Sequence, residues 1–132
     1  MKIRAALIAA CMLFTAAYTA ETVQGEYTVE LTPDAENKAK GTDKAYTDTI
    51  VIKDGKLMTA VSKRQGFKEG DVEVKVNGDK IKITAKLTGR GTGRYELELQ
   101  GETLTGRLIW DCDPGSNGPV KHAEYGIKGK KK

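Results

Sequence analysis

Four residues near the end of the chain have the chemistry of a nucleophilic site. Cys112 is the only cysteine after position 11, His122 is the only histidine, and Asp111 and Asp113 flank the cysteine. A thiol becomes a reactive thiolate beside a base or a cation, whereas neighbouring negative charge disfavours the thiolate. We therefore expect an inert loop thiol here, and we predict that the protein is not an enzyme.

Metal and phosphate sites are not indicated either. The run Asp111-x-Asp113-x-x-x-Asn117-Gly118 begins like a calcium loop but lacks that motif's ligand spacing and its terminal glutamate, so a turn-rich loop is favoured. One histidine and one cysteine make no zinc site without carboxylates. The glycine-rich run Gly89–Gly93 joins two predicted strands and opens no helix, which a phosphate loop requires. No metal and no cofactor are expected.

A ligand pocket is the remaining chemical hypothesis. Trp110 and Tyr95 are predicted to point inward at one end of the fold, with Asp48 as the polar group of that end. The complete predicted lining of this pocket is Trp110, Tyr95, Asp48, Ala85, Leu108 and Gly106. Two alternatives stay open: the aromatic residues can be core side chains of a filled barrel, and Asp48 can bind loop amides at the rim.

The strands that would position these residues are clearest in Val72–Leu87. Apolar and polar residues alternate on both sides of Gly78-Asp79, which predicts a β-hairpin with one buried face. Similar hairpins are predicted around Asp54-Gly55 and Gly101-Glu102. In each, the last inward residue of one strand and the first of the next are five positions apart.

This spacing predicts the pairs across each hairpin. The predicted pairs are Ile50 with Thr59, Val74 with Ile83, Leu97 with Gly106, Asp48 with Val61, Val72 with Ala85, and Tyr95 with Leu108. Thr59 and Gly106 fall at mid-height, where missing bulk would leave room for a ligand. Six large aliphatic residues beside the tight turns are predicted to fill the opposite end: Ile52, Leu57, Val76, Ile81, Leu99 and Leu104.

The outermost strands decide the fold class. Gly25–Leu31 is predicted as the first strand, Ala35–Ala45 as an exposed loop, and Ala123–Lys128 as the last strand, with Ala123, Tyr125 and Ile127 inward. An open sheet of about eight strands leaves two unpaired edges, which pairing of the first with the last strand removes. We predict an all-β fold, an eight-stranded antiparallel up-and-down β-barrel, with a two-sheet sandwich as the alternative.

The chain length of 132 residues permits one domain, preceded by a targeting segment. Residues 1–20 contain a basic start, a short apolar run and small residues, which predicts a signal peptide cleaved after Ala17 or Ala20. Residues 21–132 form the predicted barrel domain, secreted or periplasmic. The alternative is a lipoprotein anchored through Cys11, whose preceding apolar run is short for that role.

The charge balance argues against nucleic acid as a partner. Removing residues 1–20 lowers the formal net charge from +4 to +2, and four lysines of the last five residues carry more than that excess. The tail Lys128, Lys130, Lys131 and Lys132 is predicted to be solvated and frayed, or to contact an envelope protein or an anionic surface. A nucleic-acid-binding protein needs a basic face. The charge count of the domain without its lysine tail does not indicate one.

The pattern of Gly25-x-Tyr27 followed by a meander of tight hairpins resembles the lipocalin-like (calycin) barrels. It also resembles small secreted bacterial proteins whose hairpins read as Gly78-Asp79-Lys80-Ile81 and Gly101-Glu102-Thr103-Leu104 do. Tyr27 stands where lipocalins carry tryptophan. The resemblance implies the barrel fold. We predict a monomer that binds a small lipophilic molecule at the long-loop end. The alternative function is an envelope-associated interaction or inhibitor-like protein that uses its loops and outer face.

Overall fold

The computed structural model describes residues 22–34, 44–112 and 121–132. Its elements follow the chain as a meander: β1 (Gly25–Pro33), β2 (Tyr46–Lys53), β3 (Lys56–Thr59), α3 (Ala60–Arg64), β4 (Gly70–Asn77), β5 (Lys80–Thr88), β6 (Gly91–Gln100), β7 (Thr103–Cys112) and β8 (Lys121–Lys131). The predicted signal peptide, most of the predicted 35–45 loop and residues 113–120 of the aspartate-rich loop lie outside the described residues. No helix in the described part has the length and apolarity needed to cross a bilayer.

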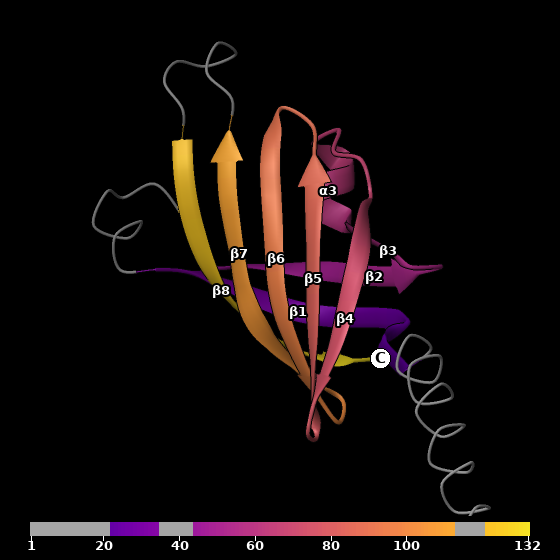
Figure 1. The fold of residues 1–132 in the computed structure, drawn as a ribbon. Coiled ribbons are helices and arrows are strands. Elements are labelled where there is room, and N and C mark those ends of the chain that lie inside the picture. The colour runs from indigo at the N-terminus through magenta and orange to yellow at the C-terminus, as the bar shows by residue number, and fades with distance from the viewer. Residues whose placement is uncertain (1–21, 35–43, 113–120) are drawn as a thin grey trace, which may run out of the picture.

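The strands close into one barrel in the order β1 to β8, and every neighbouring pair is antiparallel. The predicted eight-stranded up-and-down barrel is therefore confirmed. In Figure 1, β4 to β8 lie side by side, while β1 and β2 cross behind them at a steep angle. The curved β8 joins the two groups, because it pairs with β7 along one edge and with β1 along the other.

The predicted hairpin registers are confirmed in five of six pairs: Ile50 with Thr59, Val74 with Ile83, Leu97 with Gly106, Val72 with Ala85, and Tyr95 with Leu108. The turn residues explain why. Asp54 and Gly55 have φ angles of 53° and 75°, which is the left-handed geometry of a two-residue primed turn. Such a turn fixes the pairing of everything beyond it, since a slip of one residue would reverse the buried face.

Inward residues of all strands form one core. On β6, for example, buried and more exposed residues alternate along the strand. At the hairpin-turn end, four of the six predicted filling residues are almost wholly buried: Ile52, Leu57, Leu99 and Leu104. Burial of these side chains is the main source of stability in a barrel whose described residues contain no disulfide.

The sixth predicted pair, Asp48 with Val61, is wrong. β3 ends at Thr59, and Val61 lies in α3 instead of continuing the strand. The cause is local: the Thr59 side chain accepts a hydrogen bond from the amide of Ser62 at 3.0 Å, which is the N-cap of a helix. The early end of β3 also shortens its ladder with β4 to two pairs, Lys56 with Asp71 and Leu57 with Gly70.

Val76 was predicted to fill the hairpin end, and this prediction is wrong. Its side chain is 52% exposed, and it is the only large exposed hydrophobic residue among those the structure describes. The short ladder explains the exposure, because β3 covers β4 only as far as Val72, whose amide donates to the Gly55 carbonyl at 2.9 Å. Beyond that point no described strand pairs with the β3 side of β4, and Ile81 on the same hairpin is only partly buried.

The basic tail was predicted to be frayed, and this prediction is also wrong. β8 extends through Lys131, pairing with β1 as far as Tyr27 and with β7 as far as Thr103. Gly129 permits this approach, because a Cβ there would lie 2.1 Å from the Thr28 carbonyl oxygen. The Lys131 ammonium donates to the Thr22 carbonyl at 2.7 Å. The tail is therefore the closing strand of the barrel.

Candidate functional site

The candidate site is the end of the barrel that carries α3, opposite the three hairpin turns. Figure 1 shows α3 at this end, beside the turn that joins β5 to β6. Three of the predicted pocket residues, Asp48, Tyr95 and Trp110, lie here in two groups joined by residues 60–67. One group is polar and surrounds the start of α3. The other is aromatic and follows its end.

The polar group consists of four buried residues from four elements. They are Asp48 on β2, Thr59 on β3, Ser62 on α3 and Tyr95 on β6. The Asp48 carboxylate accepts hydrogen bonds from the amides of Thr49 at 2.7 Å and Val61 at 3.1 Å. The Ser62 hydroxyl lies 3.5 Å from the Tyr95 hydroxyl. Among the described residues no buried side-chain polar atom is left without a hydrogen-bond partner.

This network holds α3 across the barrel end. Thr59 and Asp48 together satisfy two of the amides that the first turn of a helix leaves unpaired, and the negative charge of Asp48 favours a helix N-terminus. Lys63 and Arg64 in the last turn complement the opposite end of the helix. Asp48 binds backbone amides, as in the alternative to a ligand group, but these amides belong to β2 and α3 instead of a loop. The Asp48 carboxylate therefore has a structural role, because it accepts hydrogen bonds from backbone amides.

Tyr95 is a neutral phenol in this setting. Burial raises the pKa of its hydroxyl, and the negative charge of Asp48 adds to that rise, while hydrogen bonds to Ser62 and Thr59 oppose it. A phenol with a raised pKa does not supply a phenolate nucleophile at neutral pH. Its function in this site is to close the inner side of α3 by packing and by its contact with Ser62.

The aromatic group is Phe67 stacked against Trp110. Their ring centroids are 4.6 Å apart with planes at 44°. Trp110 is partly buried and packs against the core, and a Cβ at Gly93 would lie 3.3 Å from its ring. Phe67 is almost wholly buried and rests on Gly89, where a Cβ would lie 3.1 Å from its ring. Two glycines therefore make the space in which these rings sit.

The remaining predicted lining residues are placed by the registers. Ala85, Tyr95 and Leu108 are successive partners on β5, β6 and β7, and all three are buried. Gly106 is different from what was expected. A Cβ at Gly106 would lie 2.1 Å from the Glu96 carbonyl oxygen and 2.8 Å from the Leu97 Cα, so the β6 backbone occupies the space beside it. The prediction that Gly106 leaves room for a ligand is not supported by this packing.

Sequence reasoning missed α3, Ser62 and Phe67. The available signal was the N-cap residue Thr59 followed by Gly66, whose φ of 81° ends the helical turn. It was outweighed by the regular spacing of the hairpins, which continued β3 through Val61. Because the helix has only five residues, it produces no periodic pattern that would reveal it.

The described ends of the predicted thiol loop are strand residues. Asp111 pairs with His122, and Cys112 pairs with Lys121, so the first and last residues of the predicted loop belong to β7 and β8. The His122 Nδ1 lies 2.5 Å from an Asp111 carboxylate oxygen, and its Nε2 lies 3.6 Å from Glu124. The hydrogen bond to Asp111 is the main cause that raises the pKa of His122, and Glu124 adds to it.

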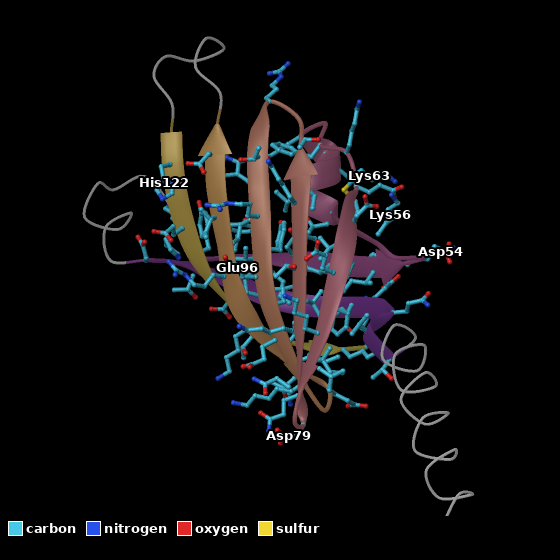
Figure 2. All side chains as sticks on the ribbon, viewed as in Figure 1. Asp54, Lys56, Lys63, Asp79, Glu96 and His122 are labelled. Atoms are coloured by element: carbon cyan, nitrogen blue, oxygen red, sulfur yellow. The ribbon has the colours of Figure 1, made fainter. Side chains whose placement is uncertain are left out.

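This histidine lies on the outer face of the barrel, as Figure 2 shows. Its side chain is 52% exposed, and Glu124 also pairs with Arg107, so the group is a surface ion-pair network. The described residues contain no cluster of three or more His, Cys, Asp or Glu side chains that would hold a metal ion.

The fold and the geometry define the class: a closed eight-stranded antiparallel β-barrel with one end covered by a short helix. Comparison with protein-family models, with curated proteins and with solved structures finds no match to this chain. Function is therefore argued from the residues of the barrel alone.

Proposed function

We propose that the protein is a non-catalytic binding barrel that takes up a small lipophilic molecule at the α3 end. The observation that carries this proposal is how that end is closed. Residues 60–67 cover it with a five-residue helix and one aromatic contact, whereas inward aliphatic side chains of the strands fill the opposite end. A cover of this kind can move without breaking a strand ladder.

The contacts that would have to open are few. They are the Asp48 hydrogen bond to the Val61 amide, the Ser62 to Tyr95 contact, and the Phe67 to Trp110 stacking. A contact of either kind contributes about 0.5–1.5 kcal/mol to stability in comparable proteins. A lipophilic ligand that occupied the place of the Phe67 ring would regain its apolar contact with Trp110.

Binding of a neutral lipophilic dye tests this proposal. N-phenyl-1-naphthylamine should increase in emission with the protein and should quench or shift the emission of Trp110, the only tryptophan. Replacing Phe67→Ala should raise the affinity, because the ring no longer competes for the site. Ala85→Leu should lower it by filling the barrel beneath. Equal dye binding by all three proteins, with circular dichroism showing them folded, would contradict the proposal.

A second candidate function rests on the edge of β4. The Val72 amide points toward the β3 side, so Val74 and Val76 direct their backbone groups to the same side, where no described strand pairs with them. An exposed strand edge with an exposed valine is a place where an extended segment of another protein can add as a strand. This favours the alternative of an interaction protein that uses its outer surface.

Native mass spectrometry of the protein taken from its host separates the two functions. A retained small mass that is lost on delipidation supports the lipophile site. A retained protein partner that is lost in a Val76→Lys variant, with the small mass unaffected, supports the strand edge instead.

A further inference from the structure

From the charges around the α3 end we infer a second property, independent of the ligand site: this end docks on an anionic phospholipid surface. The docking surface, which we name the basic rim, is formed by six cations: Lys63, Arg64, Lys68, Lys86, Arg90 and Arg94. All six side chains are exposed. They come from two segments of the chain that are separate in sequence and meet at this end.

The two segments are held together by contacts on both sides of Phe67. The Lys68 amide donates to the Thr88 carbonyl at 2.8 Å. Phe67 rests on Gly89, which precedes Arg90 in the turn between β5 and β6. Lys86 and Arg94 are direct partners on β5 and β6. The cations therefore form one continuous surface around the turn and α3.

Within the two described segments that form the rim, compensating charge is sparse. Glu69 is the one acidic residue within 60–70 and 86–94, and Glu96, two positions beyond Arg94, marks the limit of the rim on β6. None of the six cations forms an ion pair with a carboxylate of residues 22–34, 44–112 or 121–132. Near the hairpin turns, Lys56 pairs with Asp71 and Lys132 with Glu26, whereas Lys53 and Lys80 are exposed like the cations of the rim.

The pairing of Lys86 with Arg94 is unfavourable for folding, because like charges directly opposite on neighbouring strands repel. Two other like-charged pairs differ. Lys82 of the Lys75–Lys82 pair has Glu98 as its partner on β6, and Lys56 of the Lys53–Lys56 pair forms an ion pair with Asp71. An uncompensated pair inside a larger unpaired cluster is expected where the charge serves a partner. Asp54 and Asp79 lie on hairpin turns, where Lys53, Lys56 and Lys80 adjoin them (Figure 2).

The chemistry of the rim favours lipid headgroups over nucleic acid. No aromatic side chain among the described residues is exposed, so the rim has no platform on which bases would stack. The lysines and arginines of the rim would bind a plane of phosphates as separate charges. Each charge would contribute independently, and the binding would weaken as the salt concentration rises. Two of the four tail lysines, Lys131 and Lys132, are engaged with Thr22 and Glu26, which favours this end over the tail for the anionic contact.

Cosedimentation with vesicles tests the inference. The protein should bind vesicles of phosphatidylcholine containing phosphatidylglycerol, should not bind pure phosphatidylcholine vesicles, and should be released by salt. The rim variant Lys63→Gln, Arg64→Gln, Arg90→Gln should lower the partition coefficient by roughly a hundredfold, at about fivefold per charge. The matched control Lys53→Gln, Lys80→Gln, Lys130→Gln removes the same charge from exposed positions outside the rim and should lower it by less than about threefold.

A second readout reports the orientation of the docked protein. A nitroxide on the lipid headgroup should quench Trp110, which contacts Phe67 at the rim end, when the protein binds. Binding to both vesicle types alike, equal losses in the rim and control variants, or vesicle binding without quenching would each overturn the inference. Tighter binding to an oligonucleotide than to the anionic vesicles at the same salt would overturn it in favour of nucleic acid.

Discussion

Replacing Gly106→Ala decides whether the barrel has room at mid-height beside the candidate site. The added methyl group would lie 2.1 Å from the Glu96 carbonyl oxygen and 3.0 Å from the Glu96 carbonyl carbon, both of which are backbone atoms. Backbone inside a strand ladder cannot move aside as a flexible side chain can. β6 and β7 would have to separate or bend at the pair that Gly106 forms with Leu97.

The expected loss of stability follows from two costs. Overpacking by one methyl group costs about 1–3 kcal/mol in well-packed interiors. The φ of 157° at Gly106 adds strain of about 1 kcal/mol for a residue with a side chain. We expect a total near 3 kcal/mol, which corresponds to a fall in melting temperature of roughly 10 °C for a domain of this size.

Gly126→Ala is the matched control, because Gly126 pairs with Arg107 on the neighbouring strand and a Cβ there has only the Thr32 carbonyl oxygen at 3.9 Å. This change should alter the free energy of unfolding by about 0.5 kcal/mol or less. Urea unfolding followed by circular dichroism measures both variants. If Gly106→Ala is as stable as Gly126→Ala, the β6 backbone does not fill this space, and our account of Gly106 is wrong.

Three further predictions concern the cap, the histidine and the strand edge. Asp48→Ala should lower the free energy of unfolding by about 1–2 kcal/mol, because it leaves the Val61 amide unpaired, and urea unfolding will measure this. His122 should titrate above 6.5 by NMR, and Asp111→Asn should return its pKa toward that value. Because folding raises this pKa, the contact of protonated His122 with Asp111 stabilises the protein fully below pH 6.5 and is lost as the pH rises through the folded pKa. Unfolding measured as a function of pH should show this as a small effect, since the group is exposed. Val76→Lys should change the melting temperature by less than about 3 °C, since the side chain is already 52% exposed.

The barrel could be predicted from the sequence because its determinants are local. Turn residues such as Asp54 and Gly55 set the registers, and strict alternation on either side assigns each residue to a face. The closure of β1 on β8 followed from the need to remove two edges. These features depend on a few residues at a time, so a single chain is sufficient to recognise them.

The errors arose where a local pattern was overridden by a neighbour. Val76 has the alternation of a buried residue, but it is exposed because β3 ends too soon to cover it. The lysines of β8 read as a solvated tail, yet Gly129 lets the β1 backbone approach closely enough to pair with them. Neither outcome is contained in the residues of the segment itself, since each depends on what a distant strand does.

The basic rim was hidden for a related reason. A net charge is a sum over the whole domain, and the acidic residues that balance it lie on other strands and turns. Residues 60–70 and 86–94 are unremarkable in the linear sequence, and only the contacts of Phe67 with Gly89 and of Lys68 with Thr88 make their cations neighbours. A charge count therefore gives the total and does not show how the charges are arranged on the surface.

The two ends of the barrel differ in how they are anchored, and this bears on both proposals. At the hairpin end, each turn is continuous with a strand ladder, β2–β3, β4–β5 or β6–β7. At the α3 end, residues 60–67 are held by a few side-chain contacts, and the same segment carries Phe67, Lys63 and Arg64. We therefore expect motion short of unfolding to be concentrated in the segment that covers the candidate site and supplies part of the basic rim. A surface that attracts Lys63 and Arg64 acts on the same segment that a lipophilic ligand would have to displace.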